Sequence, residues 1–280
     1  MNIIQNYDVL LMDLWGVVHD GDKPYSGVIE TLIKLKELKK DVIFFSNVPR
    51  RKHTVQKILG DLGIDNSLYS ELVASGEFVH ELLAKKKQFG TKYFYLGSPE
   101  SEEVILSLDG YQKVANPKEA DFAIITGIVN YYEKAMELAM EAIKYKLPLV
   151  CTNPDKSSIK ENGEVMHCPG VVADKYEELG GTVIHFGKPY KHIYEYALQN
   201  VKDKKKVLAI GDSMANDIKG ANNAELDSVL VCSGVHRHDL KIKMGDMPTT
   251  ESLSALYKKY SIKPTFVVSL LKDIIYNAHT

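Results

Sequence analysis

The stretch YDVLLMDLWGV, residues 7–17, decides the fold of this chain. Its first six residues form a short, nearly unbroken apolar run, and an aspartate, Asp13, follows that run directly. Three similar runs, each followed by small polar residues, lie at 41–45, 207–210 and 229–232. Runs of this kind are typical of strands that are buried on both faces of a parallel sheet.

Apolar residues at helical spacing lie between these runs. The clearest series are Val28, Leu32, Leu35 and Leu38; Val55, Ile58 and Leu62; and Ile193, Tyr196 and Ala197. Alternation of short strands with amphipathic helices implies right-handed βαβ units. The sequence therefore predicts an α/β fold with a doubly wound, Rossmann-like parallel sheet.

The middle of the chain has strand and helix signals of its own. Short apolar runs lie at 93–96, 122–126 and 147–151, and Met136, Met140 and Ile143 mark one face of a helix between the last two. We therefore expect a first core segment at residues 1–87, an inserted α/β cap domain at 88–182 and a second core segment at 183–280. The Gly180-Gly181 turn marks the expected exit from the insertion.

The composition excludes several classes of function. The chain has 280 residues, and its 35 Lys and Arg nearly balance 37 Asp and Glu, which gives no electrostatic basis for a nucleic-acid partner. No apolar run approaches the roughly 18 residues of a membrane span, and the start of the sequence lacks the basic residues of a signal peptide. Three scattered cysteines, Cys151, Cys168 and Cys232, indicate a reducing compartment. We therefore expect a cytoplasmic globular protein with no membrane partner.

Polar side chains follow the predicted strands of the core. Ligands of a doubly wound sheet bind outside the carboxyl ends of its strands. The residues at or just beyond those ends are Asp13, Ser46, Asn47, Asp212, Asn216 and Asp217. One such residue alone is usually a turn former or a helix cap, but several at one edge of a sheet indicate a functional site.

Three of these residues are carboxylates that would repel one another if they were gathered at one edge: Asp13, Asp212 and Asp217. A hard cation with oxygen ligands relieves such repulsion, and Mg²⁺ suits a partly open site with few carboxylates. The sequence therefore predicts a magnesium site.

A lysine is expected at the same edge. Lys188 follows an apolar run at 183–186, and Pro189 favours the first position of the next helix. The ammonium group could then bind a phosphate oxygen and restrain a nucleophilic carboxylate, with the Ser46 hydroxyl as a neutral donor. This set of groups fits phosphoryl transfer through an aspartyl-phosphate.

The ordered set of motifs resembles the haloacid dehalogenase (HAD) superfamily, in its class IIA branch with a C2-type cap. The four HAD motifs are matched by Asp13-Leu14-Trp15-Gly16-Val17, Ser46-Asn47, Lys188 and Gly211-Asp212 with Asn216-Asp217. Branch-specific segments are matched by Pro24-Tyr25-Ser26-Gly27, Ser75-Gly76-Glu77, Asn153-Pro154-Asp155, Pro169-Gly170, Gly187-Lys188-Pro189 and Ser233-Gly234-Val235. The resemblance covers nearly the whole chain and implies a p-nitrophenylphosphatase-like or nucleotide phosphatase-like hydrolase.

The resemblance also implies roles for the metal-site residues. Asp13 would be the nucleophile and, together with Asp212, a ligand of Mg²⁺. The third protein ligand would be the backbone carbonyl of Trp15. Asp217 would not contact the ion directly but would support the residues that do. Asn216 would order its loop and help to bind the phosphate.

Further implications concern the substrate. Ser46, Asn47 and Lys188 would hold the phosphoryl group, and the cap region at 153–170 would cover the site and select the leaving group. The resemblance thus implies a small phosphorylated metabolite as substrate, and it allows a homodimer formed through the cap.

One position departs from the pattern of the family. HAD phosphatases usually carry a second aspartate two residues after the nucleophile, where it protonates the leaving group and then activates water. Here this position is Trp15, whose indole N–H cannot exchange a proton near neutral pH. Loss of a positioned acid–base group typically removes about 10²–10⁴ in rate.

Three interpretations follow from this departure. The first is a Mg²⁺-dependent phosphatase that is slow, or in which His19 or Asp20 supplies the acid–base group. The second is hydrolysis of a carbon–halogen bond, because a departing halide needs no proton, although the retained metal-site carboxylates speak against it. The third is a phosphoryl-ligand binding protein that has kept the site and lost turnover.

Overall fold

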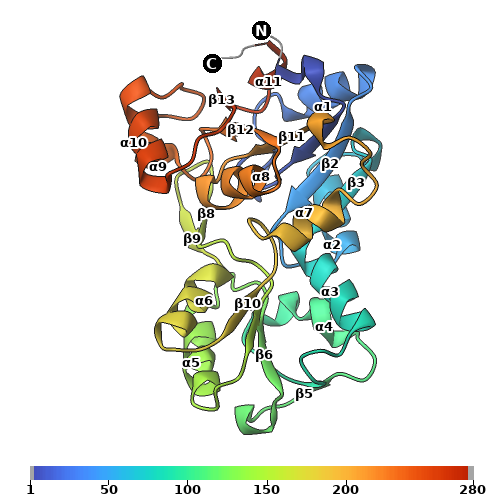
Figure 1. Cartoon of the computed structure of the whole chain (residues 1–280), viewed down its shortest axis with the longest axis vertical. Coiled ribbons are helices and arrows are strands. Elements are labelled where there is room, and N and C mark those ends of the chain that lie inside the picture. Colours follow the sequence, from blue (N-terminus) through green and yellow to red (C-terminus); the bar gives the residue numbers. More distant parts are fainter. Residues whose placement is uncertain (1–2, 277–280) are drawn as a thin grey trace.

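The computed structural model describes residues 3–276 and shows two parallel sheets, one in each half of the molecule (Figure 1). Residues 1–2 and 277–280 of the expected core segments lie outside the described residues. The larger sheet has the strand order β13-β12-β11-β1-β2-β3, and all of its strands are parallel. Its strands are β1 (Val9–Met12), β2 (Asp41–Ser46), β3 (Glu71–Ala74), β11 (Val207–Gly211), β12 (Asp227–Val231) and β13 (Phe266–Val268).

Helices cover both faces of this sheet. Leu10 and Met12 of β1 pack into one hydrophobic cluster with α1 (Val28–Glu37) and α2 (Lys52–Asp61). Leu11 packs into the opposite cluster with α7 (Lys191–Ala197) and α8 (Lys219–Asn223). Successive side chains of a strand point to opposite faces, so one short apolar run supplies both clusters. The prediction of a doubly wound α/β core is confirmed.

The second sheet has the strand order β10-β7-β6-β4-β5 and is also parallel. Its strands are β4 (Lys92–Tyr95), β5 (Gln112–Lys113), β6 (Phe122–Ile125), β7 (Leu149–Cys151) and β10 (Val183–His185). Helices α5 (Tyr132–Ile143) and α6 (Pro169–Glu178) pack on one face, and α3 (Ser75–Lys85) and α4 (Glu103–Leu106) pack on the other.

Two elements at the expected boundaries of the insertion belong with the second sheet. We expected the second core segment to begin at residue 183, but β10 pairs with β7 through Val183 and Leu149. We also expected the first core segment to reach residue 87, but Val79 and Leu83 of α3 pack into the cluster on the second sheet. An apolar run does not reveal which of two sheets it will join. We therefore propose that the inserted unit spans residues 75–186.

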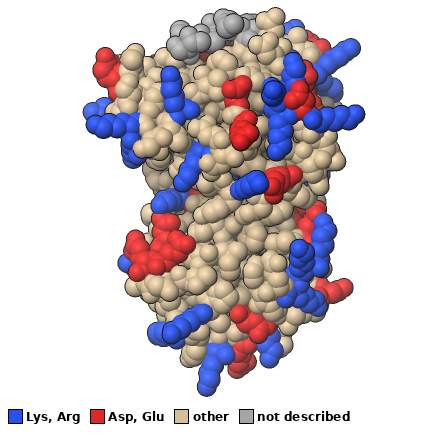
Figure 2. All heavy atoms as spheres, in the orientation of Figure 1, with Lys and Arg blue, Asp and Glu red and all other residues tan. Residues whose placement is uncertain are grey.

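The remaining elements connect or flank the sheets. An antiparallel hairpin of β8 (Ser157–Ile159) and β9 (Val165–His167) lies between the two halves (Figure 1). The other helices are α9 (Arg237–Leu240), α10 (Thr250–Tyr260) and α11 (Asp273–Tyr276), with a π-helical turn η6 (Met214–Ile218) and 3₁₀ turns η1 (Ile3–Asn6), η2 (Asn66–Leu68), η3 (Pro99–Ser101), η4 (Pro117–Glu119) and η5 (Lys204–Lys206). Among residues 3–276, no helix is long and apolar enough to cross a membrane. Positive and negative side chains are interspersed over the face drawn in Figure 2.

Candidate active site

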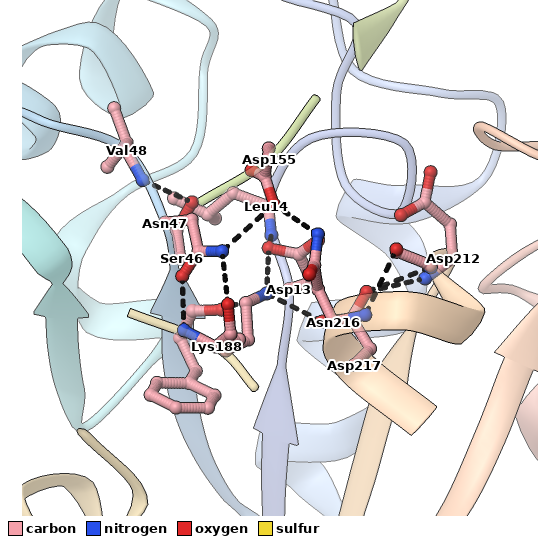
Figure 3. Close-up of polar contacts among 12 residues, drawn as sticks. Asp13, Leu14, Ser46, Asn47, Val48, Asp155, Lys188, Asp212, Asn216 and Asp217 are labelled. Atoms are coloured by element: carbon pink, nitrogen blue, oxygen red, sulfur yellow. Dashed lines mark hydrogen bonds and ion pairs between the residues drawn. The ribbon is translucent and has the colours of Figure 1, made fainter. Parts of the chain in front are cut away.

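The carboxyl ends of three adjacent strands bring the predicted site residues together (Figure 3). Asp13 follows β1, Ser46 ends β2, and Asp212 follows β11. Because β1 lies between β11 and β2 and runs parallel to both, the three residues meet at one edge of the sheet. All three side chains are buried. Geometry thus places these polar residues where the sequence predicted a functional site.

Three carboxylates form the centre of this site. One oxygen of each of Asp13, Asp212 and Asp217 lies within 4.8 Å of the others, and all three residues are buried. Burial raises the pKa of Asp13 to about 7; Lys188 opposes this effect and Asp217 adds to it. Burial also raises the pKa of Asp212 well above its ordinary value, as do Asp217 and Asp13. Ionisation of all three carboxylates would therefore give the cluster more negative charge than Lys188 can balance, and a divalent cation with oxygen ligands would favour the ionised forms.

Lys188 lies among these carboxylates. Its Nζ is 2.7 Å from Oδ1 of Asp13 and 2.6 Å from Oδ1 of Asp217, and it donates a 3.0 Å hydrogen bond to the carbonyl of Phe45. Burial alone would lower the pKa of Lys188, but the surrounding carboxylates raise it, so the side chain is protonated near neutral pH. The predicted contact of Lys188 with Asp13 is thus present in the structure.

The backbone of Lys188 is held by Asn47. The Lys188 N–H donates to Asn47 Oδ1 at 2.6 Å, and the Lys188 carbonyl accepts from Asn47 Nδ2 at 3.1 Å. The expectation that Pro189 begins the next helix is wrong, because α7 starts at Lys191 and Tyr190 precedes it in an extended conformation. The position of Lys188 therefore depends on a side chain at the end of β2 rather than on a helix that starts at the proline.

The loop after β11 fixes Asp212 and Asp217. Asp217 lies in η6, and its Oδ2 accepts from the backbone N–H groups of Asp212 and Ser213 at 3.1 and 2.9 Å. Asp212 Oδ2 accepts from the Val235 N–H at 2.7 Å. A Cβ at Gly234 would clash with the Asp212 carboxylate, so the chain can approach Asp212 this closely only with glycine at that position. Both oxygens of Asp217 are engaged within the protein, which suits the predicted supporting role of this residue next to Asp212.

Asp155 is a site residue that sequence reasoning missed. It lies in the connection between β7 and β8, and its Oδ1 accepts from Asn47 Nδ2 at 2.9 Å and from Asn216 Nδ2 at 2.6 Å. Burial raises its pKa to about 6, against the opposing effect of Lys188 and the Asn47 hydrogen bond. Its sequence signal is the Asn153-Pro154-Asp155 motif, which resembles a cap signature that covers the site and does not by itself indicate a contact with Asn47 or Asn216.

These contacts change the interpretation of two predicted phosphate-binding residues. The side-chain amide of Asn47 already forms hydrogen bonds with the Lys188 backbone and with Asp155, and the Asn216 side chain donates to Asp155. Ser46, in contrast, lines the cavity above Asp13, and its Oγ accepts only a long 3.3 Å bond from the Val48 N–H. We therefore propose that Asn47 and Asn216 position other groups, and that Ser46 is the neutral donor to a phosphoryl group.

Trp15 links its own loop to the β8–β9 hairpin. Its Nε1 donates to the Ile159 carbonyl at 3.1 Å, and its ring lies edge-on to His19. His19 Nδ1 accepts from the Gly21 N–H, and burial lowers the pKa of His19 to about 4, so the ring is neutral near pH 7 and is not the imidazolium that a general acid requires.

Asp20 also serves the structure of this loop. Its Oδ1 accepts from the N–H groups of Asp22 and Lys23, and its Oδ2 accepts from the N–H of Glu161 in the hairpin. These backbone hydrogen bonds lower the pKa of Asp20 although burial acts in the opposite direction. The geometry therefore does not favour His19 or Asp20 as a replacement for the missing acid–base aspartate.

Two cavities meet at this site. A small one of about 50 Å³ is lined by Asp13, Lys188 and Asp212 among others. A larger one of about 260 Å³ lies beside it, and the two share Trp15, Ser46, Asp155 and Ser158. The site can thus hold a small group against Asp13 and a larger group next to it.

Comparison with known proteins agrees with the motifs. A family model described as haloacid dehalogenase-like hydrolase matches residues 10–110, and a model described as HAD-hydrolase-like matches residues 185–274. A 4-nitrophenylphosphatase of Schizosaccharomyces pombe is 29% identical over 270 residues, which cover 84% of this chain and 87% of that protein.

Solved structures share the fold. A haloacid dehalogenase-like hydrolase from Brucella suis has a TM-score of 0.79 and 27% identity, with 96% of this chain and 97% of that one covered. A glycerol phosphate phosphatase of Mycobacterium tuberculosis, solved in complex with magnesium, has a TM-score of 0.73 and 22% identity, with 99% and 79% covered. The chain belongs to the haloacid dehalogenase-like hydrolases. The prediction of a hydrolase of this superfamily, similar to its 4-nitrophenylphosphatases, is confirmed.

Proposed function

We propose that the chain is a Mg²⁺-dependent phosphohydrolase that cleaves a small phosphomonoester through an aspartyl-phosphate on Asp13. The observation that carries this proposal is the position of the Asp13 carboxylate, which lies against Lys188 Nζ and within 4.8 Å of two further carboxylates. The phosphatase names of relatives that align along most of the chain support the same reaction.

The donor set fits magnesium. Buried carboxylates in excess over cationic groups offer the hard oxygen ligands that Mg²⁺ prefers. Asp13, Asp212 and the backbone carbonyl of Trp15 would hold the ion, while Asp217 fixes the loop of Asp212 through its bonds to backbone N–H groups. When bound, Mg²⁺ would neutralise phosphoryl charge and polarise the P–O bonds.

The protein groups carry out the rest of the reaction. An oxygen of Asp13 attacks phosphorus, the bond from phosphorus to the ester oxygen breaks, and the leaving alcohol takes the electron pair. Ser46 Oγ donates to a phosphoryl oxygen. The Lys188 ammonium already has partners in Asp13, Asp217 and the Phe45 carbonyl, so its contact with the phosphoryl group replaces one of these. Water then hydrolyses the aspartyl-phosphate and regenerates Asp13.

Trp15 supports a second candidate function. Because no acid–base aspartate occupies this position, a protein that binds phosphoryl ligands and turns them over very slowly is the alternative. Dehalogenation is less well supported, since the metal-site carboxylates are present and relatives are named as phosphatases. A small metabolite substrate, a homodimer and a cytoplasmic location stay predictions.

Hydrolysis of 4-nitrophenyl phosphate with Mg²⁺ tests the proposal. We expect turnover by the wild type and by an Asp61→Asn control on the surface, and none by Asp13→Asn. A wild type that is inert, next to a Trp15→Asp variant that is active, would support the binding protein instead. Release of halide from a 2-haloacid without metal would contradict both functions.

A further inference from the structure

The larger cavity beside Asp13 is the place for the leaving group. It shares Trp15, Ser46, Asp155 and Ser158 with the small cavity in which Asp13 lies. A phosphoryl group bound against Asp13 and Ser46 would fill the small cavity of about 50 Å³. The remainder of the ester must then enter the adjoining space of about 260 Å³.

The walls of this cavity are mainly apolar and come from both halves of the molecule. Val48 and Ile58 contribute from the side of the larger sheet, and Ile128, Val129 and Met166 contribute from the inserted unit. Cavities with such walls bind flat, apolar groups and provide few partners for a chain of hydroxyl groups.

Trp15 provides a rigid aromatic surface in the same cavity. Its indole is fixed by the hydrogen bond from Nε1 to the Ile159 carbonyl and by edge contact with the His19 ring. Gly21 lies so close to the six-membered part of the ring that an added Cβ would clash with it. A planar ring can stack on, or meet edge-on, an aromatic surface held in this way.

Several polar side chains that line the cavity are already engaged by protein groups. Arg50 donates to the Glu100 carbonyl, and Asp155 accepts from Asn47 and Asn216. Ser101 Oγ is paired with Ser98 Oγ. A sugar-like substrate could hydrogen-bond to Asp155 or Ser101 only in competition with these protein partners, and a buried hydroxyl without a partner weakens binding.

The chemistry at Trp15 points to the same class of substrate by a separate route. In the first step Asp13 forms a bond to phosphorus, and the ester oxygen departs with the bonding electron pair. The indole N–H donates to the Ile159 carbonyl and cannot give up a proton near neutral pH, so the oxygen leaves as an anion and takes a proton from water afterwards. A phenol, with a pKa near 10 as in tyrosine, tolerates this departure far better than an aliphatic alcohol.

We propose that the cavity formed by Trp15, Ile128, Val129 and Met166 selects phosphomonoesters of apolar aromatic alcohols. This inference rests on the proposed function and adds the class of leaving group. Two properties are required together: an apolar ring that fits the cavity, and an oxygen that leaves without a proton.

Three esters separate these two properties: phenyl phosphate, cyclohexyl phosphate and glycerol 3-phosphate. Cyclohexyl phosphate has the apolar ring but a poor leaving group, and glycerol 3-phosphate has neither. In the wild type we expect kcat/KM for phenyl phosphate to exceed that for cyclohexyl phosphate by about 10²–10⁴-fold. As competitive inhibitors, cyclohexyl phosphate should bind about 10–100-fold more tightly than glycerol 3-phosphate.

Variants assign these preferences to residues. In the wild type, cyclohexyl phosphate is expected to have a lower inhibition constant than glycerol 3-phosphate. Met166→Asn should reduce the ratio of these two inhibition constants at least severalfold. The control Val165→Asn, whose site is the exposed neighbour of Met166 on β9, should leave this preference unchanged. Trp15→Asp introduces a proton donor next to the leaving group. We therefore expect it to reduce the ratio of kcat/KM for phenyl phosphate to kcat/KM for cyclohexyl phosphate.

The outcomes distinguish this inference from the function beneath it. If glycerol 3-phosphate is hydrolysed with a kcat/KM equal to that of phenyl phosphate, and Asp13→Asn is inactive, the inference is overturned and the proposed function stands. If Met166→Asn and Val165→Asn have the same inhibition preference, the cavity assignment is also overturned. If no ester phosphorylates Asp13, both the inference and the proposed function fail.

Discussion

Asp155, in the connection between β7 and β8, accepts a 2.6 Å hydrogen bond from the side chain of Asn216 after β11. The same carboxylate oxygen accepts from Asn47 after β2. A single residue of the inserted unit thereby contacts the two loops that hold Lys188 and Asp217 in position. The contact joins the inserted unit directly to the edge of the larger sheet at which Asp13 and Asp212 lie.

Removal of the Asp155 carboxylate should therefore impair catalysis. In Asp155→Ala both amides lose their shared acceptor, and Lys188 loses part of the support that it receives through Asn47. Loss of such an outer partner typically costs about 10–100-fold in activity, and we expect kcat/KM to fall by that factor. Steady-state assays with an aryl phosphate measure it. Asp109→Ala, at an exposed position of the inserted unit, is the matched control, and equal activity of the two variants would show that the Asp155 contact is dispensable.

Magnesium should stabilise the folded protein measurably. A ligand that binds the folded state at 100 times its dissociation constant adds about 2.7 kcal/mol to the free energy of unfolding. We expect Tm to rise with Mg²⁺ concentration in the wild type and in Asp61→Asn, and to stay constant in Asp212→Asn. Without metal, Asp212→Asn should be no less stable than the wild type, because it removes one of three mutually repelling carboxylates. An identical Mg²⁺ response of Asp212→Asn and Asp61→Asn would place the ion elsewhere.

Two glycines offer a matched pair of substitutions. In Gly234→Ala the new methyl group meets the Asp212 carboxylate, so we expect loss of the magnesium-dependent rise in Tm and of activity. Gly60→Ala lies in α2 with open space around the new methyl group, and it should stabilise the protein by about 0.4–1 kcal/mol. Thermal unfolding with and without Mg²⁺ distinguishes the two. A Gly234→Ala variant with normal metal response would mean that Asp212 tolerates displacement.

His19 should make stability depend on pH. Burial lowers its pKa from 6.5 to about 4, so the unfolded chain binds more protons than the folded one between these two values. The contribution of His19 to the free energy of unfolding is complete above pH 6.5 and is lost as the pH falls toward 4. At pH 5 the loss amounts to about 2 kcal/mol.

The variant His19→Asn isolates this contribution, because asparagine keeps an acceptor for the Gly21 N–H and does not titrate. Urea unfolding of both proteins at pH 7 and pH 5 gives the free energies. His192 and His236 also have lowered pKa values and act equally in both proteins. A difference between wild type and variant that is the same at both pH values would refute the prediction.

The strands of the core and the residues at their ends could be predicted from the sequence, for a physical reason. A strand buried on both faces is a compact apolar run, and the first polar residue after it marks the edge of the sheet, as Asp13 after β1 shows. Adjacent parallel strands then bring their ends together. The prediction that Asp13 and Asp212 meet therefore needed no knowledge of loops. Lys188 follows β10 of the second sheet, so its position at this edge depends on loop contacts such as the hydrogen bonds with Asn47.

Other features depend on contacts that the local pattern does not contain. Asp155 is more than 100 residues from Asn47, and an irregular connection places it against the site. In α5 the sequence indicated Met136, Met140 and Ile143 as one face, whereas the fully buried residues are Ala135, Ala139 and Ala142. Small side chains allow α5 to approach its neighbours closely, and the larger residues pack at the margin of that contact.

The position of β1 has a consequence for the newly made chain. Among the strands of residues 3–276, β1 is synthesised before all others, yet it lies in the middle of its sheet, between β2 and β11. Its pairing with β2 can form early, but β11 becomes available only after residue 211 has been synthesised. Until then one edge of β1 has no partner, and open strand edges recruit other chains. Expression yield should thus respond to how quickly the inserted unit is translated and to the supply of chaperones during that interval.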